Sequence, residues 1–157
     1  MANKNRASTS QPPRTPSPRD RVNTSRRRRL WLIAAAARAR LAAVAPYSGF
    51  KVGAALLARG GKIFTGANVE SASYGLTCCA ERVALFGALT RGQRGFTAIA
   101  VVARIPQGPM PCGACRQLLA EYAPDAVVCV ADSDQLHVVR EFSVKALLPA
   151  AFLNVPT

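Results

Sequence analysis

The chain has 157 residues, which suits a single domain of ordinary size. Its 21 Lys and Arg residues against 8 Asp and Glu residues give a net charge of +13, of which +8 falls within residues 1–29 and +5 within residues 30–157. No apolar run approaches the ~20 residues of a membrane span, which excludes an integral membrane protein. Five cysteines, an odd and clustered set, argue against a secreted disulfide framework and for a reducing compartment such as the cytoplasm.

The first 29 residues are rich in Ser, Thr, Pro and Arg and almost free of apolar side chains. We expect a disordered basic extension here, because four prolines between residues 12 and 18 oppose a helix and nothing can fill a core. The arginines at 26–29 could bind nucleic acid or anionic lipid, and the composition also resembles an organelle transit peptide. An extension without a partner is the favoured interpretation, so neither a nucleic-acid nor a membrane partner is expected.

From residue 30 onward the hydrophobic pattern predicts alternating helices and strands. Helical spacing of apolar residues predicts a helix over 30–45, and two apolar runs around a Gly-Gly turn predict a hairpin over 50–65. Further along, the pattern predicts helices over 79–91 and 112–122, strands over 96–103, 126–131 and 136–142, and a short final helix that Ser143 caps. This order predicts an α/β fold, a three-layer α-β-α sandwich around one mixed sheet of about five strands.

Two cysteine clusters each begin a predicted helix after a loop. The first contains Cys78 and Cys79, and the second is Cys112-Gly-Ala-Cys115. The C-x-x-C spacing lets two sulfurs of one helical turn bind one metal ion, and a third sulfur can come from the other helix. Three protein ligands leave one vertex for water, which is typical of catalytic zinc. The positive end of each helix dipole also favours the thiolate form that binds metal.

A structural zinc site is the alternative, and it needs a fourth ligand. Cys78 adjoins Cys79 and is badly placed to bind the same ion, while Cys129 lies within a predicted strand, as small core residues do. Glu81 lies on the first turn of the same helix as Cys79, where it can reach a zinc-bound water without binding the metal. Arg82 follows directly and can offset the net negative charge of three thiolates and one Zn²⁺.

The residues Cys79-Ala80-Glu81 with Pro111-Cys112-x-x-Cys115 resemble the signature of zinc-dependent nucleobase and nucleoside deaminases. Three further segments, at 46–56, 68–75 and 147–152, are similar to cytidine deaminases in particular. The resemblance covers about residues 30–153 and implies a cytidine deaminase domain over 30–157 with that family's fold. It also implies hydrolytic deamination of cytidine and 2′-deoxycytidine to uridine and 2′-deoxyuridine plus ammonia, as in pyrimidine salvage.

The resemblance implies a role for each residue of the metal site. Cys79, Cys112 and Cys115 would bind one zinc ion per chain. Glu81 would be the catalytic proton shuttle, and Arg82 would support the site from just outside the ligands. An all-cysteine ligand set is similar to that of the small homotetrameric cytidine deaminases.

The resemblance further implies seven substrate contacts: Phe50, Asn68, Val69, Glu70, Tyr74, Ala80 and Phe152. Phe50 would stack on the pyrimidine, and Asn68 and Glu70 would bind the ribose hydroxyls. Val69 and Ala80 would contribute mainly through their backbones. The remaining two aromatic residues match positions that family members supply from neighbouring subunits, which implies a homotetramer with shared active sites.

The leading alternative is a deaminase of another small aminopyrimidine such as blasticidin S. That family resembles the chain around the zinc site but lacks the Asn-x-Glu and Ser-Tyr-Gly pattern found at 68–75. A polynucleotide deaminase is disfavoured, because residues 30–157 show no basic stripe with interleaved aromatic residues. A non-enzymatic zinc module would not need Glu81.

Overall fold

The structure, a computed structural model, describes residues 18–153, with side chains from residue 25 onward. One mixed sheet has the strand order β2-β1-β3-β4-β5, in which only β3 and β4 are parallel. The strands are β1 (Val52–Ala58), β2 (Ile63–Ala67), β3 (Phe96–Ala103), β4 (Val127–Asp132) and β5 (Val139–Ser143). The α-helices are α1 (Pro18–Ala39), α2 (Ala80–Leu89), α3 (Gly113–Tyr122) and α4 (Val144–Leu147), and short 3-10 helices cover Arg40–Ala42 and Tyr74–Leu76.

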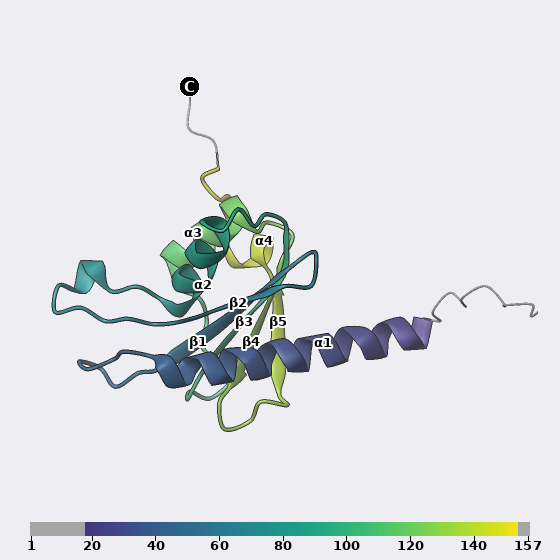
Figure 1. Ribbon diagram of the computed structural model, residues 1–157. Coiled ribbons are helices and arrows are strands. Elements are labelled where there is room, and N and C mark those ends of the chain that lie inside the picture. Colours follow the sequence, from purple (N-terminus) through teal and green to yellow (C-terminus); the bar gives the residue numbers. More distant parts are fainter. Residues whose placement is uncertain (1–17, 154–157) are drawn as a thin grey trace, which may run out of the picture.

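The helices lie on both faces of this sheet (Figure 1). Helix α1 covers one face, and α2, α3 and α4 cover the other, so the predicted three-layer α-β-α sandwich is confirmed. Alternate residues of β3 serve the two sides: Ile99 belongs to the core under α2, and Val102 belongs to the core under α1. Because both faces are covered, the central strands are apolar almost throughout.

Two glycines let helices approach the sheet backbone. A Cβ atom on Gly53 would clash with the carbonyl oxygen of Ala36 in α1. A Cβ atom on Gly66 would lie 2.5 Å from the carbonyl oxygen of Ala80 in the first turn of α2. Only glycine permits such contact without displacing backbone, so Gly66 determines how closely the start of α2 approaches β2.

Helix α1 begins at Pro18, whereas the sequence pattern predicts a helix start at residue 30 and a disordered extension before it. Proline is well tolerated in the first turn of a helix, where its missing N–H would have had no partner. The helix is also anchored early, since the Arg29 side chain forms an ion pair at 2.8 Å with Glu141 on β5. Residues 1–17, the rest of the expected disordered extension, lie outside the described residues.

The other elements agree with the sequence pattern to within a few residues. Helix α1 ends at Ala39, and one 3-10 turn follows where the pattern extends the helix to residue 45. Ser143 caps α4 as predicted, and its hydroxyl accepts a hydrogen bond from the backbone N–H of Ala146. None of the helices described between residues 18 and 153 is long and apolar enough to cross a membrane.

Candidate metal centre and active site

Three cysteine sulfurs meet where α2 and α3 begin. Cys79 is the N-cap residue of α2, Cys112 is the N-cap residue of α3, and Cys115 lies in the first turn of α3. Their Sγ atoms all lie within 4.8 Å of one another, and those of Cys79 and Cys112 are 3.7 Å apart. Two sulfurs bound to one tetrahedral zinc ion at ~2.3 Å lie about 3.8 Å from each other. The spacing and chemistry of the donors therefore fit one zinc ion.

No fourth His, Cys, Asp or Glu within residues 25–153 joins this group. Cys78 adjoins Cys79 in the chain but is not part of the sulfur cluster. Cys129 is fully buried in the core between the sheet and α1, on the opposite face from α2 and α3. The described side chains thus supply three ligands, which is the arrangement of a catalytic zinc site rather than a structural one.

The surroundings of the sulfurs stabilise negative charge. Neither Cys79 nor Cys112 caps its helix through its side chain, so unpaired N–H groups and two positive helix ends adjoin the cluster. One guanidinium nitrogen of Arg82 donates to the carbonyl oxygen of Thr77 at 2.6 Å and lies 3.7 Å from the Cys79 sulfur. A hydrogen bond from Cys115, together with Arg82, lowers the pKa of Cys79 to about 5. Arg82 therefore lies where the sequence predicts a compensating cation.

Glu81 occupies the first turn of α2 and lines the same cavity as Cys79 and Cys112. Only 6% of the residue is exposed, and this burial raises the pKa of its carboxyl group. Cys115 is also close enough to hydrogen-bond to it. The structure thus brings one buried carboxyl group, from the first turn of α2, beside the sulfur cluster.

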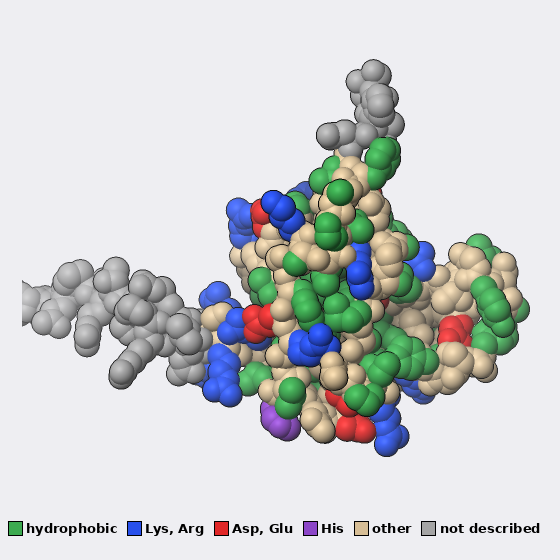
Figure 2. All heavy atoms as spheres, turned by 180° about the vertical axis from the view of Figure 1, so that it is seen from behind, with side chains coloured by type: hydrophobic (Ala, Val, Ile, Leu, Met, Phe, Trp, Pro, Cys, Tyr) green, Lys and Arg blue, Asp and Glu red, His purple; other side chains and the backbone are tan. Residues whose placement is uncertain are grey.

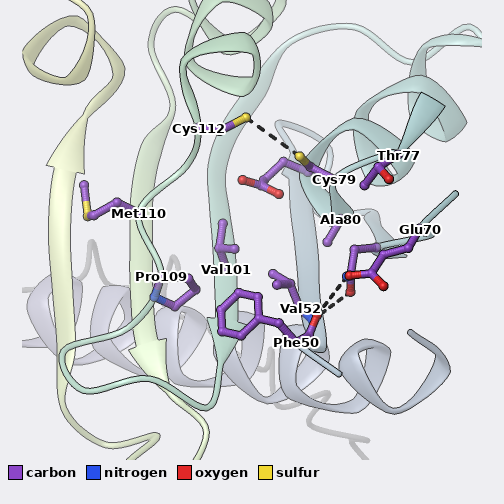
Figure 3. Close-up of a pocket in the computed structure, with 12 residues that line it drawn as sticks. Phe50, Val52, Glu70, Thr77, Cys79, Ala80, Val101, Pro109, Met110 and Cys112 are labelled. Carbon is purple, nitrogen blue, oxygen red and sulfur yellow. Dashed lines mark hydrogen bonds between the residues drawn. The ribbon is translucent and has the colours of Figure 1, made fainter. Parts of the chain in front are cut away.

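A cavity of about 260 Å³ extends from the sulfurs to the surface (Figure 3). Four of the seven predicted substrate contacts line it: Phe50, Asn68, Glu70 and Ala80. In Figure 3 the Phe50 ring lies below the sulfurs, and Ala80 and Glu70 lie to the right of it. The cavity is slightly smaller than the ~300–1,000 Å³ of sites for drug-sized ligands, and its volume suits a small metabolite.

Asn68 holds together two segments of the cavity wall. Its side-chain oxygen accepts from the backbone N–H of Val52 at 2.8 Å, and its side-chain nitrogen donates to the carbonyl oxygen of Phe50 at 2.9 Å. The residue is 7% exposed, and its two hydrogen bonds are partly shielded from water. The amide keeps one N–H and one lone pair for a further partner.

Glu70 lies at the mouth of the cavity and organises the loop before β1. Its carboxylate accepts from the backbone N–H groups of Tyr47, at 2.9 Å, and Ser48, at 3.1 Å, and from the Ser48 hydroxyl. The Ser48 hydroxyl, followed by these two backbone groups, lowers the pKa of Glu70. An ionised carboxylate is therefore available at the cavity mouth.

The other three predicted contacts do not line this cavity within one chain. The backbone of Val69 pairs with that of Cys78, which aligns the segment before Cys79 but leaves the Val69 side chain 45% exposed. Tyr74 is 82% exposed and Phe152 is 67% exposed. The backbone oxygen of Phe152 accepts a hydrogen bond from Gln117 on α3 at 2.6 Å. Contacts of Tyr74 and Phe152 with a neighbouring subunit stay predictions.

Sequence reasoning missed Pro109 and Met110, which form the side of the cavity away from Ala80 (Figure 3). They follow a turn in which Gln107 and Gly108 both have positive φ angles, 66° and 78°. A Cβ atom on Gly108 would lie 2.6 Å from a backbone nitrogen of β4. The sequence signal that could have indicated Pro109 and Met110 is their position directly before Pro111-Cys112, where the second cysteine cluster begins. The cavity's other unpredicted lining residues are Val52, Thr77 and Val101.

Comparisons with known proteins agree with this geometry. The family model for the cytidine and deoxycytidylate deaminase zinc-binding region matches residues 26–131. A cytidine deaminase of Halalkalibacterium halodurans is 50% identical over 124 residues, which cover 79% of this chain and 93% of that protein. The crystal structure of a cytidine deaminase from Burkholderia pseudomallei matches with 52% identity and a TM-score of 0.75, over 78% of this chain and 97% of that one.

A blasticidin-S deaminase from Bacillus cereus is 33% identical over 110 residues, which cover 64% of this chain and 76% of that protein. Its similarity is lower in both identity and coverage than that of the cytidine deaminase relative. The family match, the relatives and the sulfur cluster agree with one another. The chain therefore belongs to the zinc-binding cytidine and deoxycytidylate deaminase family.

Proposed function

We propose that the chain is a zinc-dependent cytidine deaminase, which hydrolyses cytidine and 2′-deoxycytidine to uridine and 2′-deoxyuridine and releases ammonia. The observation that carries this proposal is the convergence of three sulfur ligands and one buried carboxyl group on a single cavity. Cys79, Cys112 and Cys115 hold one zinc ion per chain. When bound, zinc makes a water molecule nucleophilic at neutral pH and stabilises developing negative charge.

Glu81 moves the protons of the reaction. It accepts one proton from the attacking water and donates it to N3 of the ring, then accepts the second proton of the same oxygen and delivers it to the departing amine. The bond from C4 to oxygen forms, the bond from C4 to nitrogen breaks, and the carboxyl group ends in its starting state. Its location in the cavity beside Cys79 and Cys112 supports this role, because the proton donor must face both the water and the ring.

The positions of the reacting carbon and of the ribose on the pyrimidine ring determine how the nucleoside lies in the cavity. C4 must face the metal, so the ribose, attached across the ring at N1, must face the cavity mouth. Glu70 and the remaining bonding capacity of Asn68 suit the ribose hydroxyls there, and Phe50 suits the flat face of the base. The backbone of Ala80, which lines the cavity, suits contact with the polar atoms of the ring, and Val69 contributes through its backbone.

Residues of neighbouring subunits complete the cavity in this proposal. Tyr74 and Phe152 are large and mostly exposed in the single chain, and aromatic residues such as these are enriched at protein–protein interfaces. We assign them to the active sites of adjacent chains in a homotetramer. The enzyme then acts in the cytoplasm in pyrimidine salvage, which agrees with its unpaired cysteines.

The test is a substrate screen with zinc-loaded protein, followed by ultraviolet absorbance and chromatography of the products. We expect cytidine and 2′-deoxycytidine to become uridine and 2′-deoxyuridine, with cytosine and blasticidin S turned over far more slowly. Cytosine is the matched control, because it presents the same C4 amine without the ribose that Glu70 and Asn68 would bind. Consumption of blasticidin S without turnover of cytidine would replace this proposal with the alternative function.

A further inference from the structure

The exposed side of α1 carries basic residues around one aromatic side chain. Residues four and seven apart lie on the same side of a helix, which places Arg27, Trp31 and Arg38 in one row. All three are exposed, and Trp31 is 55% exposed. Along the axis they span about 16 Å at ~1.5 Å per residue. The row therefore crosses residue 29, where the sequence pattern predicts the boundary between a basic extension and the domain that follows.

The positive charge of this row is largely uncompensated. Arg26 and Arg28 are exposed beside Arg27, whereas Arg29 turns toward the sheet and pairs with Glu141. Among the side chains that the structure describes, that carboxylate is the only one paired with an arginine of α1. Figure 2 shows Lys and Arg side chains gathered where the helix leaves the body of the molecule.

We propose that the row of Arg27, Trp31 and Arg38 on α1, with the exposed Arg26 and Arg28 on either side of it, binds single-stranded nucleic acid. Arginines bind backbone phosphates and release their counterions, and an exposed indole ring can stack on an unpaired base. The sequence indicates residues 26–29 as a possible nucleic-acid-binding arm, but the expected boundary after residue 29 separated these arginines from Trp31. The continuous helix restores the spacing of a basic stripe with an aromatic residue.

The structure disfavours two other occupants of this face. A helix that binds a membrane must insert a free apolar face, but Leu32, Ile33 and Ala36 of α1 are already buried against the sheet. A second copy would bring the same arginines together, and like charges repel. A polyanion with flat, stackable bases fits both the charge and the indole ring.

Binding on α1 is separate from deamination. Helix α1 covers one face of the sheet, whereas the helices that carry Cys79 and Cys112 cover the other (Figure 1). A strand held along α1 therefore does not present its bases to the cavity. The inferred surface keeps the enzyme on nucleic acid without making the polymer a substrate, and it does not depend on the proposed function.

The test is fluorescence anisotropy of a labelled single-stranded RNA with the full zinc-loaded chain at several salt concentrations. Replacing Arg26, Arg27 and Arg28 together by Ala should lower the slope of log affinity against log salt by about 2, and the affinity about 100-fold at 0.1 M salt. The matched control replaces three exposed basic residues outside α1, namely Arg59, Lys62 and Arg91, and should change affinity less than ~3-fold if few phosphates are contacted there.

Substitutions of Trp31 distinguish the contribution of base stacking from the contribution of charge. Trp31→Ala should weaken binding roughly 10-fold with the salt slope unchanged, and Trp31→Phe should restore most of the loss. Circular dichroism of each variant reports whether the fold is intact. The proposal is overturned if the wild-type chain does not bind RNA at ~10⁻⁴ M, the weak end of non-specific binding. It is equally overturned if both triple variants lose the same affinity, or if anionic vesicles bind and RNA does not.

Discussion

Asn68 connects the packing of the sheet to the shape of the substrate cavity. Replacing Asn68 with Ala removes the partners of the Val52 N–H and the Phe50 carbonyl, whose bonds to the amide are 2.8 and 2.9 Å long. Losing the partner of a buried polar group costs about 1–3 kcal/mol, and two such partners are lost here. Because the strand end is only partly buried, water replaces part of this bonding and lowers the total cost. We therefore expect the free energy of unfolding to fall by about 2–4 kcal/mol. The domain should stay folded if its stability is the typical ~5–15 kcal/mol.

Urea unfolding followed by circular dichroism measures this change, and steady-state kinetics with cytidine measures its effect on the cavity. We expect kcat/KM to fall together with stability, because Phe50 is no longer held beside β1. Thr65→Ala, on the exposed side of the neighbouring strand β2, is the control and should stay within ~0.5 kcal/mol of the wild type. If Asn68→Ala unfolds like the wild type while losing activity, Asn68 only contacts substrate and the packing role is wrong.

A second diagnostic variant is Asn68→Asp. The carboxylate can still accept from the Val52 N–H, but its other oxygen replaces the group that donates to the Phe50 carbonyl. Two acceptors then face each other, so we expect this nearly isosteric variant to be destabilised as well. Wild-type stability for Asn68→Asp would show that the bond to Phe50 contributes little.

Three further substitutions test the site and the fold. Glu81→Gln should retain one zinc per chain, measured by mass spectrometry of the metal, and lose at least about 100-fold in kcat; activity near the wild-type level would remove Glu81 from proton transfer. Cys112→Ser should lose both zinc and thermal stability, whereas Cys78→Ser, beside the cluster but outside it, should keep both; equal zinc loss in the two variants would contradict the ligand assignment. Gly66→Ala should lower the thermal midpoint and soluble yield, because its Cβ would press on the backbone of α2; an unchanged midpoint would refute that close approach.

Much of the metal site could be predicted from sequence because it depends on local spacing. Cys112 and Cys115 are three residues apart at the start of α3, so helix geometry brings their sulfurs close. Cys79 and Glu81 lie at the start of α2, and they reach the same cavity because the two helix starts meet there. The sequence also predicts strands β3 and β4, because burial on both faces of the sheet makes them continuously apolar.

The features that were missed depend on contacts between distant residues. Asn68 binds backbone atoms 16 and 18 residues away, and no local pattern reveals such a role. Met110 reaches the cavity through a turn whose Gln107 adopts a left-handed conformation that non-glycine residues seldom adopt. The start of α1 was missed because Pro18 was interpreted as a helix breaker, although proline is favourable in a first turn.

The most direct test of the account is to compare zinc content with cytidine turnover in the same samples. Increasing amounts of chelator should give samples with progressively less zinc. We expect activity to fall in proportion to zinc content, with full activity at about one zinc per chain, and to return when zinc is restored. A protein that deaminates cytidine at full rate with its zinc removed would contradict the account at its centre.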